Sequence, residues 1–434
     1  MDKMADVLGR AGAWCGQNKY LSAIKNAFQN FMPLTIAGAI GVLWCNVLVN
    51  DQTGLGLFFK PIMALDFLNP AFQAVNFCTI SCITVGITLG IAQEIGVWNM
   101  GAEKAGYIPG LVGLAAWLSV TNTSHMVEGA KEAFTGIAGN ELGATGLFTG
   151  MIIGVLSVEL FCFFEKQDAL KIKMPEQVPP GVARAFEVLV PATITLIITA
   201  CIGSACYNLT GLYLNDVIKN GIQGPLGAVG ATIPGVMIIY LVIMLFWLVG
   251  IHGNNMLSAV KEALFTPLAL ENVEKFNKGE KPTNIINMYF LQMCGEFGGS
   301  GVTIGLVIAI MIFGKREDNK AIATLSLVPG LFNINETVTF GVPMVLNPIL
   351  GIPFVVAPLI TIIIGYVLTV IGFCPVACLT VPWTTPPIVF GFLATGANVM
   401  GAVTQAILIV VSTVIYTPFL ISYEKYQNKQ AAEA

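Results

Sequence analysis

Long apolar segments dominate this sequence and leave few folds open to it. An α-helix needs about 20 apolar residues to cross the hydrocarbon core of a bilayer. Of the 434 residues, 55% are hydrophobic and only 11% are charged, whereas soluble domains carry about 25% charged residues. These charges are too few to cover the surfaces of soluble domains, so lipid is the expected outer solvent for most of the chain.

The hydropathy pattern predicts an all-α polytopic membrane protein with about ten transmembrane helices plus re-entrant hairpins. The predicted spans lie near residues 31–49, 70–91, 105–121, 145–164, 187–209, 227–251, 300–314, 352–372, 376–396 and 399–422. The segment 322–349 is also apolar, but glycines and prolines between residues 329 and 348 interrupt it. An interrupted apolar segment favours a re-entrant hairpin over a continuous span.

The distribution of basic residues predicts which loops face the cytoplasm. The N-terminal segment is basic, a cluster of Lys and Arg occupies 165–185, and Lys425 and Lys429 follow the last predicted span. The loop 122–144 is mostly acidic instead. We therefore expect a multi-pass protein with cytoplasmic N- and C-termini. The basic residues at 315–320 also favour the cytoplasm. Alternation of the spans does not allow both this loop and the C-terminus to be cytoplasmic, so the side of 315–320 is left open.

Several functional classes are excluded by charge and by residue counts. The net charge of -4 and the pI of about 5.3 argue against nucleic-acid binding, which needs a basic footprint. With only two histidines, a His-rich metal site is excluded. Cys374 and Cys378 could form a metal or redox pair, but they lie in apolar sequence, where cysteines usually act as small hydrophobic residues. We predict no metal and no cofactor.

Polar groups gather in the second half of the chain. Residues 1–210 hold ordinary apolar spans, whereas residues 211–434 hold broken apolar segments and most of the unusual polar residues. The sequence therefore predicts two domains with a division near residue 210. The second is expected to bind the substrate.

Two glycine-containing elements form the first part of the predicted polar site. His252 follows a strongly apolar run and stands between Gly250-Ile251 and Gly253-Asn254. Its imidazole can both donate and accept hydrogen bonds. The segment Gly298-Gly299-Ser300-Gly301 predicts a turn with exposed backbone amides, which suits hydroxyl or anion binding. Each element also has a structural interpretation, as an interfacial helix end and as a tight turn for close helix packing.

A carboxylate flanked by asparagines is the strongest signal in the chain. Glu336 follows Asn333 and Asn335 inside an apolar tract, and a charge at bilayer depth costs about 2.5–3.5 kcal/mol even on the mildest scale. It therefore needs a partner, water, or backbone amides at a hairpin tip. Trp383 lies between prolines and can stack on the apolar face of a sugar ring or serve as an interfacial tryptophan.

Together these groups predict a site for a neutral, polyhydroxylated ligand. Amides, hydroxyls, an imidazole, a carboxylate and an indole are present, whereas a phosphorylated or carboxylated ligand would recruit Arg or Lys. The predicted substrate-binding residues are His252, Asn254, Gly299, Ser300, Asn333, Asn335, Glu336 and Trp383.

The same motifs resemble those of the Enzyme IIC of the bacterial phosphoenolpyruvate–sugar phosphotransferase system, in its lactose/cellobiose/diacetylchitobiose branch. The resemblance rests on the His252, Gly298–Thr303 and Asn333–Pro348 elements and extends over nearly the whole chain. It implies the Enzyme IIC sugar-transporter fold and a homodimer in the bacterial inner membrane. Residues 1–210 would form the dimer interface, and residues 211–434 would carry the sugar by an elevator-type motion.

The resemblance also implies roles for particular residues. His252 and Glu336 match the family's positions near the hydroxyl that becomes phosphorylated, so we predict these two as catalytic; Asn335 and Trp383 match further sugar-site positions. The expected substrate is a β-linked disaccharide such as cellobiose or diacetylchitobiose. The phosphoryl donor would be a phosphocysteine on a separate IIB protein, which works with IIA. Thr337 departs from the family, which usually has proline at this position.

Two other functions compete with this interpretation. A proton-coupled sugar symporter would use Glu336 as its proton carrier, and its uptake would collapse with a protonophore. A membrane enzyme acting on lipid-linked sugars would need acidic pairs or metal ligands, but Glu336 stands without another acidic residue nearby in the sequence.

Overall fold

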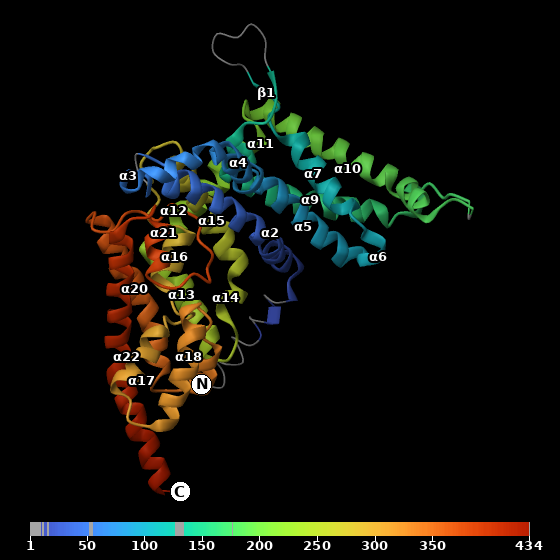
Figure 1. Cartoon of the computed structure of the whole chain (residues 1–434). Coiled ribbons are helices and arrows are strands. Elements are labelled where there is room, and N and C mark those ends of the chain that lie inside the picture. The colour runs from blue at the N-terminus through green and yellow to red at the C-terminus, as the bar shows by residue number, and fades with distance from the viewer. Residues whose placement is uncertain are drawn as a thin grey trace. The chain divides into compact units, whose positions relative to one another are not determined.

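The computed structural model describes residues 10, 13–14, 17–51, 55–125, 134–175 and 177–433. Within these ranges the chain is mostly helical, and β1 (Ser124–His125) pairs antiparallel with β2 (Phe134–Thr135). The chain divides into two compact units (Figure 1). Unit 2 comprises Gln17–Gly38 and Val75–Gly227, and unit 1 comprises Ala39–Ala74 and Ala228–Ala434 with the described residues before 17. The predicted functional division at residue 210 stays a prediction.

The helices up to residue 230 include all those of unit 2 and the first helices of unit 1. In chain order they are α2 (Lys19–Leu43), η1 (Trp44–Leu48), α3 (Leu55–Phe58), η2 (Lys60–Leu68), α4 (Asn69–Asn76), η3 (Phe77–Ser81), α5 (Ile83–Met100), α6 (Ala102–Ala105), α7 (Ile108–Val120), α8 (Gly139–Leu142), α9 (Ala144–Glu165), η4 (Asp168–Leu170), α10 (Pro180–Thr210), α11 (Leu214–Ile218), η5 (Lys219–Gln223) and α12 (Gly224–Gly230).

Small residues allow the central helices of unit 2 to approach closely. A Cβ added at Gly113 of α7 would lie 2.3 Å from the Cβ of Ala92 on α5. One added at Gly150 of α9 would lie 2.2 Å from the hydroxyl oxygen of Thr88, also on α5. Contacts between small residues are typical of helix packing in membranes, where burial of apolar surface supplies little association energy. Trp117 of α7 is fully buried in the resulting core.

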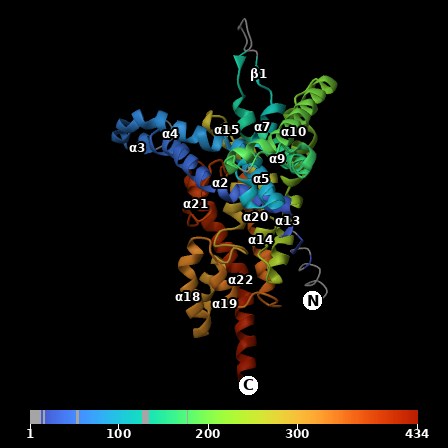
Figure 2. The same ribbon diagram turned by 90° about the vertical axis from the view of Figure 1, so that its right-hand side faces the viewer.

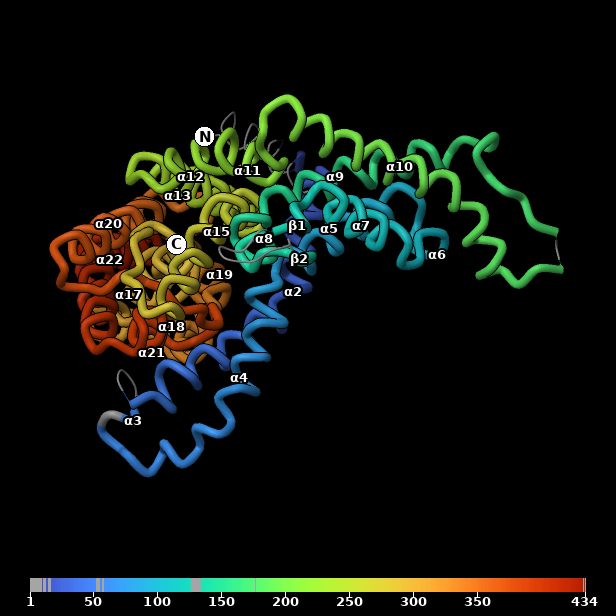
Figure 3. Tube along the Cα trace, turned by 90° about the horizontal axis from the view of Figure 1, so that it is seen from above, coloured from blue at the N-terminus to red at the C-terminus, as the bar shows by residue number. Residues whose placement is uncertain are grey.

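The helices after residue 230 all belong to unit 1. They are α13 (Ile233–Leu248), α14 (Gly253–Met256), α15 (Ser258–Asn277), α16 (Met288–Gly295), α17 (Ile304–Phe313), α18 (Glu317–Leu331), α19 (Glu336–Gly341), α20 (Gly351–Val370), α21 (Val389–Ala394) and α22 (Val399–Glu433). Helix α22 packs against α17, α20 and α21 and ends in a long C-terminal projection beyond them (Figures 1 and 2). Figure 3 shows α17, α18, α20 and α22 gathered in one bundle.

The all-α polytopic fold class is confirmed. Among the described residues, five helices are long and apolar enough to cross a membrane, and two bent helix pairs raise the number to seven. The pair Lys60–Ser81 and Ile83–Met100 bends by 41°, and the pair Leu214–Gly230 and Ile233–Leu248 by 76°. Two shorter apolar helices, Ile108–Val120 and Ile304–Phe313, coincide with predicted spans. The count of about ten spans stays a prediction.

One predicted span is wrong, and one predicted interruption is present. Residues 376–396 do not form a continuous helix, because only α21 at their end is helical. Four prolines between 375 and 387 remove backbone donors and clash with the preceding turn. The segment 322–349 is interrupted as predicted, with α18 ending at Leu331 and α19 beginning at Glu336. The orientation prediction rests partly on residues 1–9 and 126–133, which lie outside the described residues.

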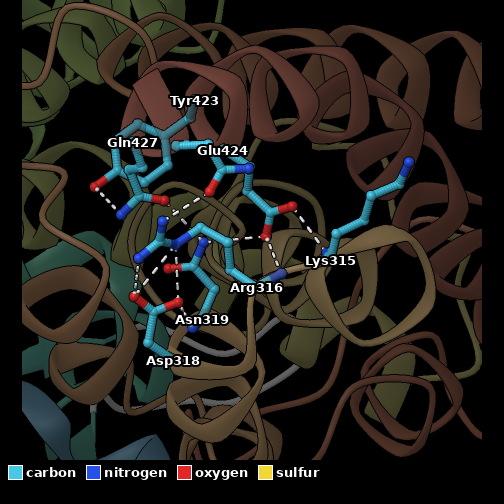
Figure 4. A network of polar contacts seen from close by, with 8 residues as sticks. Lys315, Arg316, Asp318, Asn319, Tyr423, Glu424 and Gln427 are labelled. Atoms are coloured by element: carbon cyan, nitrogen blue, oxygen red, sulfur yellow. Dashed lines mark hydrogen bonds and ion pairs between the residues drawn. The ribbon is translucent and has the colours of Figure 1, made fainter. Parts of the chain in front are cut away.

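A buried carboxylate on α22 fixes the loop between α17 and α18 (Figure 4). Glu424 accepts hydrogen bonds from the backbone amides of Lys315 at 2.8 Å and Arg316 at 3.3 Å, and from the side chain of Asn319 at 3.1 Å. Arg316 forms a 2.6 Å ion pair with Asp318, and its hydrogen bonds hold the pKa of that carboxyl below its usual value. Glu424 thus anchors the start of α18, whose other end leads to the predicted site.

Candidate functional site

His252 is held at the start of the short helix α14, just beyond the end of α13. Gly250 has a φ of +82°, which lets the chain turn sharply before the histidine. The Nδ1 atom of His252 accepts a hydrogen bond from the backbone amide of Asn255 at 3.3 Å. Because Nδ1 acts as the acceptor, a neutral imidazole carries its hydrogen on Nε2. The buried indole of Trp247 packs beside the ring, with centroids 4.4 Å apart.

Glu336 is the first residue of α19 and lies next to this imidazole. Its Oε1 atom is 3.9 Å from Nε2 of His252, and the two side chains are 49% and 37% exposed respectively. This separation is longer than a hydrogen bond, so a hydroxyl or a water can lie between the two groups. The structure brings together the two residues that the sequence singled out; their role at a sugar hydroxyl stays a prediction.

The glycine loop, which we define as Gly298–Val302, contacts the segment that carries Glu336. Gly299 has a φ of +88°, and a Cβ there would lie 2.6 Å from the side chain of Asn335. Asn335 donates from Nδ2 to the Ser300 carbonyl at 2.7 Å. The Ser300 hydroxyl accepts from Nδ2 of Asn254 at 2.9 Å. These four predicted site residues therefore lie in one contact network.

Asn333 links two loops through its side chain. Its backbone has a φ of +62°, a conformation that asparagine tolerates better than most residues. Its Oδ1 accepts from the Gly298 amide at 2.6 Å, and its Nδ2 donates to the carbonyls of Trp383 at 2.5 Å and Thr385 at 3.1 Å. Both amide hydrogens are thus used by the backbone. Asn333 serves as a structural link here, and its predicted contact with substrate remains untested.

Trp383 lies in the irregular segment that replaces the predicted span at 376–396. The residue is 42% exposed. Its backbone carbonyl is held by Asn333, which places the tryptophan segment beside the glycine loop. This position agrees with either of the two sequence-based interpretations, sugar stacking or membrane-interface anchoring.

An ion pair that the sequence analysis overlooked lies buried in the same unit. Lys261 of α15 pairs with Oε1 of Glu296, and the buried hydroxyl of Tyr240 donates to that same oxygen at 2.8 Å. Lys261 lies in α15, directly after α14, and Glu296 lies two residues before the glycine loop. The sequence did carry a signal for this pair, because a lysine in an apolar setting needs a partner for the same reason as Glu336. The pair is neutral overall, so it adds no free cation near His252.

Metal ligation finds no support in the described part of the chain. No group of three or more His, Cys, Asp or Glu side chains there could hold a metal ion. Cys374 and Cys378 are buried with free thiols.

Comparison with known proteins gives consistent matches over nearly the whole chain. Residues 25–358 match the family described as Phosphotransferase system, EIIC. The chain is 33% identical over 429 residues to the oligo-β-mannoside-specific EIIC component of Bacillus subtilis (strain 168), covering 98% of this chain and 94% of that protein. It is 30% identical over 486 residues to the cellobiose-specific EIIC component of Lactococcus lactis subsp. lactis (strain IL1403), covering 98% of each.

A solved structure shares the fold. The crystal structure of the transporter ChbC, the IIC component from the N,N'-diacetylchitobiose-specific phosphotransferase system, matches with a TM-score of 0.88 at 30% sequence identity. The match covers 97% of both chains. The chain therefore shares the fold of a solved IIC component.

Proposed function

This chain belongs to the EIIC family of the phosphotransferase system, and on that premise we propose that it carries a β-linked disaccharide across the membrane for phosphorylation by a separate IIB protein. The relatives named above are specific for oligo-β-mannosides, cellobiose and N,N'-diacetylchitobiose. These sugars share a β-glycosidic link and have no phosphate. An uncharged sugar suits this site, because the nearby Lys261 is already paired with Glu296.

The observation that carries the proposal is the 3.9 Å separation of His252 Nε2 and Glu336 Oε1. A sugar hydroxyl placed between them would accept a hydrogen bond from Nε2–H and donate one to the carboxylate. The histidine ring already has its Nε2 hydrogen when neutral, because Nδ1 is occupied by the Asn255 amide. Glu336 is therefore our candidate for the group that accepts the hydroxyl proton.

The chemical step then follows from this placement. The sugar 6-hydroxyl oxygen attacks the phosphorus of the phosphocysteine on IIB, the sulfur–phosphorus bond breaks, and the hydroxyl proton passes to Glu336. His252 orients the attacking oxygen. The sugar phosphate carries a new charge, and Lys261 is already paired with Glu296, so release of the product is favoured.

The remaining predicted residues complete the site in this proposal. In this proposal Ser300 and Asn254, which are hydrogen-bonded to each other, shift to sugar hydroxyls, and Trp383 offers a ring face. Asn333 and Asn335 hold the loops in place through backbone contacts. We include all the predicted residues in the site, with the two asparagines acting mainly through the loops.

The assembly and topology are further parts of the proposal. We assign a homodimer interface to residues 1–210, an elevator-type motion to residues 211–434, and cytoplasmic positions to both chain ends in the bacterial inner membrane. The apolar helices and the match to a solved IIC component support a membrane permease. The family match supports this function over the proton-coupled symporter, because EIIC proteins act with IIB and IIA components.

Transport in vesicles tests the proposal. Purified protein would be reconstituted and loaded inside with phosphorylated IIB, and radiolabelled cellobiose or N,N'-diacetylchitobiose would be added outside. We expect labelled sugar phosphate inside the vesicles, and none when IIB is unphosphorylated. Accumulation of free sugar that ignores IIB and collapses with a protonophore would overturn the proposal in favour of a symporter.

A further inference from the structure

The tryptophan loop, which we define as residues 382–388, ends in a strained backbone conformation. Ile388 has a φ of +76° and a ψ of -52°. Residues with a Cβ rarely adopt positive φ, and for a β-branched residue such as isoleucine it is an outlier. Such a conformation persists only where neighbouring groups hold it in place, and strained backbone often lies at functional sites. The structure must therefore contain groups that hold this end of the loop.

Gln405 of α22 supplies that restraint. It is 1% exposed, and its Oε1 accepts hydrogen bonds from the backbone amides of Ile388 and Gly391, each at 2.7 Å. Its Nε2 donates to the Met293 carbonyl at 3.1 Å. Gly391 permits this approach, because a Cβ there would lie 2.5 Å from the Gly401 carbonyl oxygen and 2.9 Å from Oε1 of Gln405.

The three bonds of Gln405 join the same two segments that Asn333 joins. Met293 lies on α16, which runs directly into the glycine loop, and Ile388 ends the tryptophan loop. Asn333 connects the Gly298 amide to the carbonyls of the tryptophan loop at Trp383 and Thr385. The Asn333 carboxamide therefore connects the two segments near Gly298, and the Gln405 carboxamide connects them near Met293.

We propose that Gln405 is a positioning residue for the sugar site, which sets the place of Trp383 relative to the glycine loop. Its three hydrogen bonds all go to protein backbone, so it acts through the two loops. The inference rests on the proposed function, because it assumes that a disaccharide binds beside these loops. A substitution at Gln405 should therefore weaken sugar binding and loosen the tryptophan loop together.

The test compares binding and loop exchange in the full-length protein in detergent micelles. Equilibrium dialysis with radiolabelled cellobiose and N,N'-diacetylchitobiose gives the Kd, and hydrogen–deuterium exchange reports on residues 382–391. Gln405→Met keeps the side-chain length and removes all three bonds. We expect its Kd to rise about tenfold or more and its exchange in 382–391 to accelerate. Gln405→Glu, in the protonated form that burial favours, keeps an oxygen for both amides and a hydroxyl donor for the Met293 carbonyl, and should restore most of the affinity.

A matched control lies on the same helix. Ser412 is fully buried on α22, and its hydroxyl donates within its own helix, to the Ile409 carbonyl at 2.9 Å. Ser412→Ala should leave both the Kd and the exchange of residues 382–391 unchanged. If this variant weakens binding as much as Gln405→Met does, the effect belongs to the helix in general and the proposal fails.

The remaining outcomes are equally decisive. Wild-type affinity in Gln405→Met, weaker binding with unchanged exchange, or failure of Gln405→Glu to restore affinity would each overturn the positioning role. If Gln405→Met does not fold, hydrogen–deuterium exchange of the wild-type protein tests the proposal instead. Fast exchange of the Ile388 and Gly391 amides would contradict the restraint by Gln405. Absence of disaccharide binding by the wild-type protein would instead count against the proposed function.

Discussion

Replacing Glu336 by glutamine perturbs the proposed chemistry while keeping the shape of the side chain. The change removes the proton acceptor that lies 3.9 Å from His252 Nε2. A positioned acid or base contributes about 10²–10⁴-fold to a reaction rate, so we expect sugar phosphorylation by Glu336→Gln to fall by about that factor. The effect on stability should be small, about 0–1 kcal/mol, because both side chains are substantially exposed and such pairs contribute little.

Transfer of phosphate from phosphorylated IIB to radiolabelled disaccharide measures this effect, and thermal unfolding in detergent checks the fold. Glu317→Gln is the matched control, because Glu317 is an acidic residue of the same unit whose side chain is 88% exposed. Its transfer rate should equal that of the wild type. A wild-type rate in Glu336→Gln would refute the reasoning, and so would a lost rate that follows only from unfolding.

Three further predictions follow from the same geometry. His252→Gln keeps a hydrogen-bond donor, so the phosphorylation rate should fall less than in Glu336→Gln, by about tenfold; an equal or larger fall in the same assay would contradict the assigned roles. Trp383→Phe should keep most of the sugar affinity and Trp383→Ala should lose it, measured as Kd by equilibrium dialysis; equal affinities would assign Trp383 to the membrane interface. Arg316 lowers the pKa of Asp318, so the stabilisation from this pair is present above the usual Asp pKa of about 4 and is lost as the pH falls through the lowered value. Thermal unfolding of Arg316→Ala should therefore depend less on pH in that acidic range than that of the wild type, and identical profiles would contradict the assignment.

The fold class and the polar elements could be predicted from the sequence because both depend on local composition. Apolar runs of sufficient length indicate helices in lipid, and a carboxylate inside such a run demands a partner. Glu336 and His252 were found in this way, and the structure places them together. The interruption at 322–349 was also visible, since its prolines and glycines together weaken a continuous helix.

The errors arise where tertiary contacts decide. The segment 376–396 is apolar enough for a span, but its prolines prevent a continuous helix. Its irregular backbone accepts a hydrogen bond from Asn333 and donates one to Gln405. Gln405 is a single polar residue in a long apolar helix and has no local motif around it. Asn333 was visible as a polar residue, yet the sequence does not tell whether a carboxamide faces a ligand or a backbone. The pair of Lys261 and Glu296 joins two helices that are distant in sequence.

The central claim is that Glu336 and His252 together hold the sugar hydroxyl that receives phosphate. A thermodynamic cycle tests it most directly, by measuring the Kd of a β-linked disaccharide and of its 6-deoxy analogue for the wild type and for Glu336→Gln. We predict that removal of the hydroxyl weakens binding to the wild type by about tenfold or more and has little effect on the variant, because contacting groups are not additive. An equal loss of affinity in both proteins would show that Glu336 does not contact this hydroxyl and would contradict the claim.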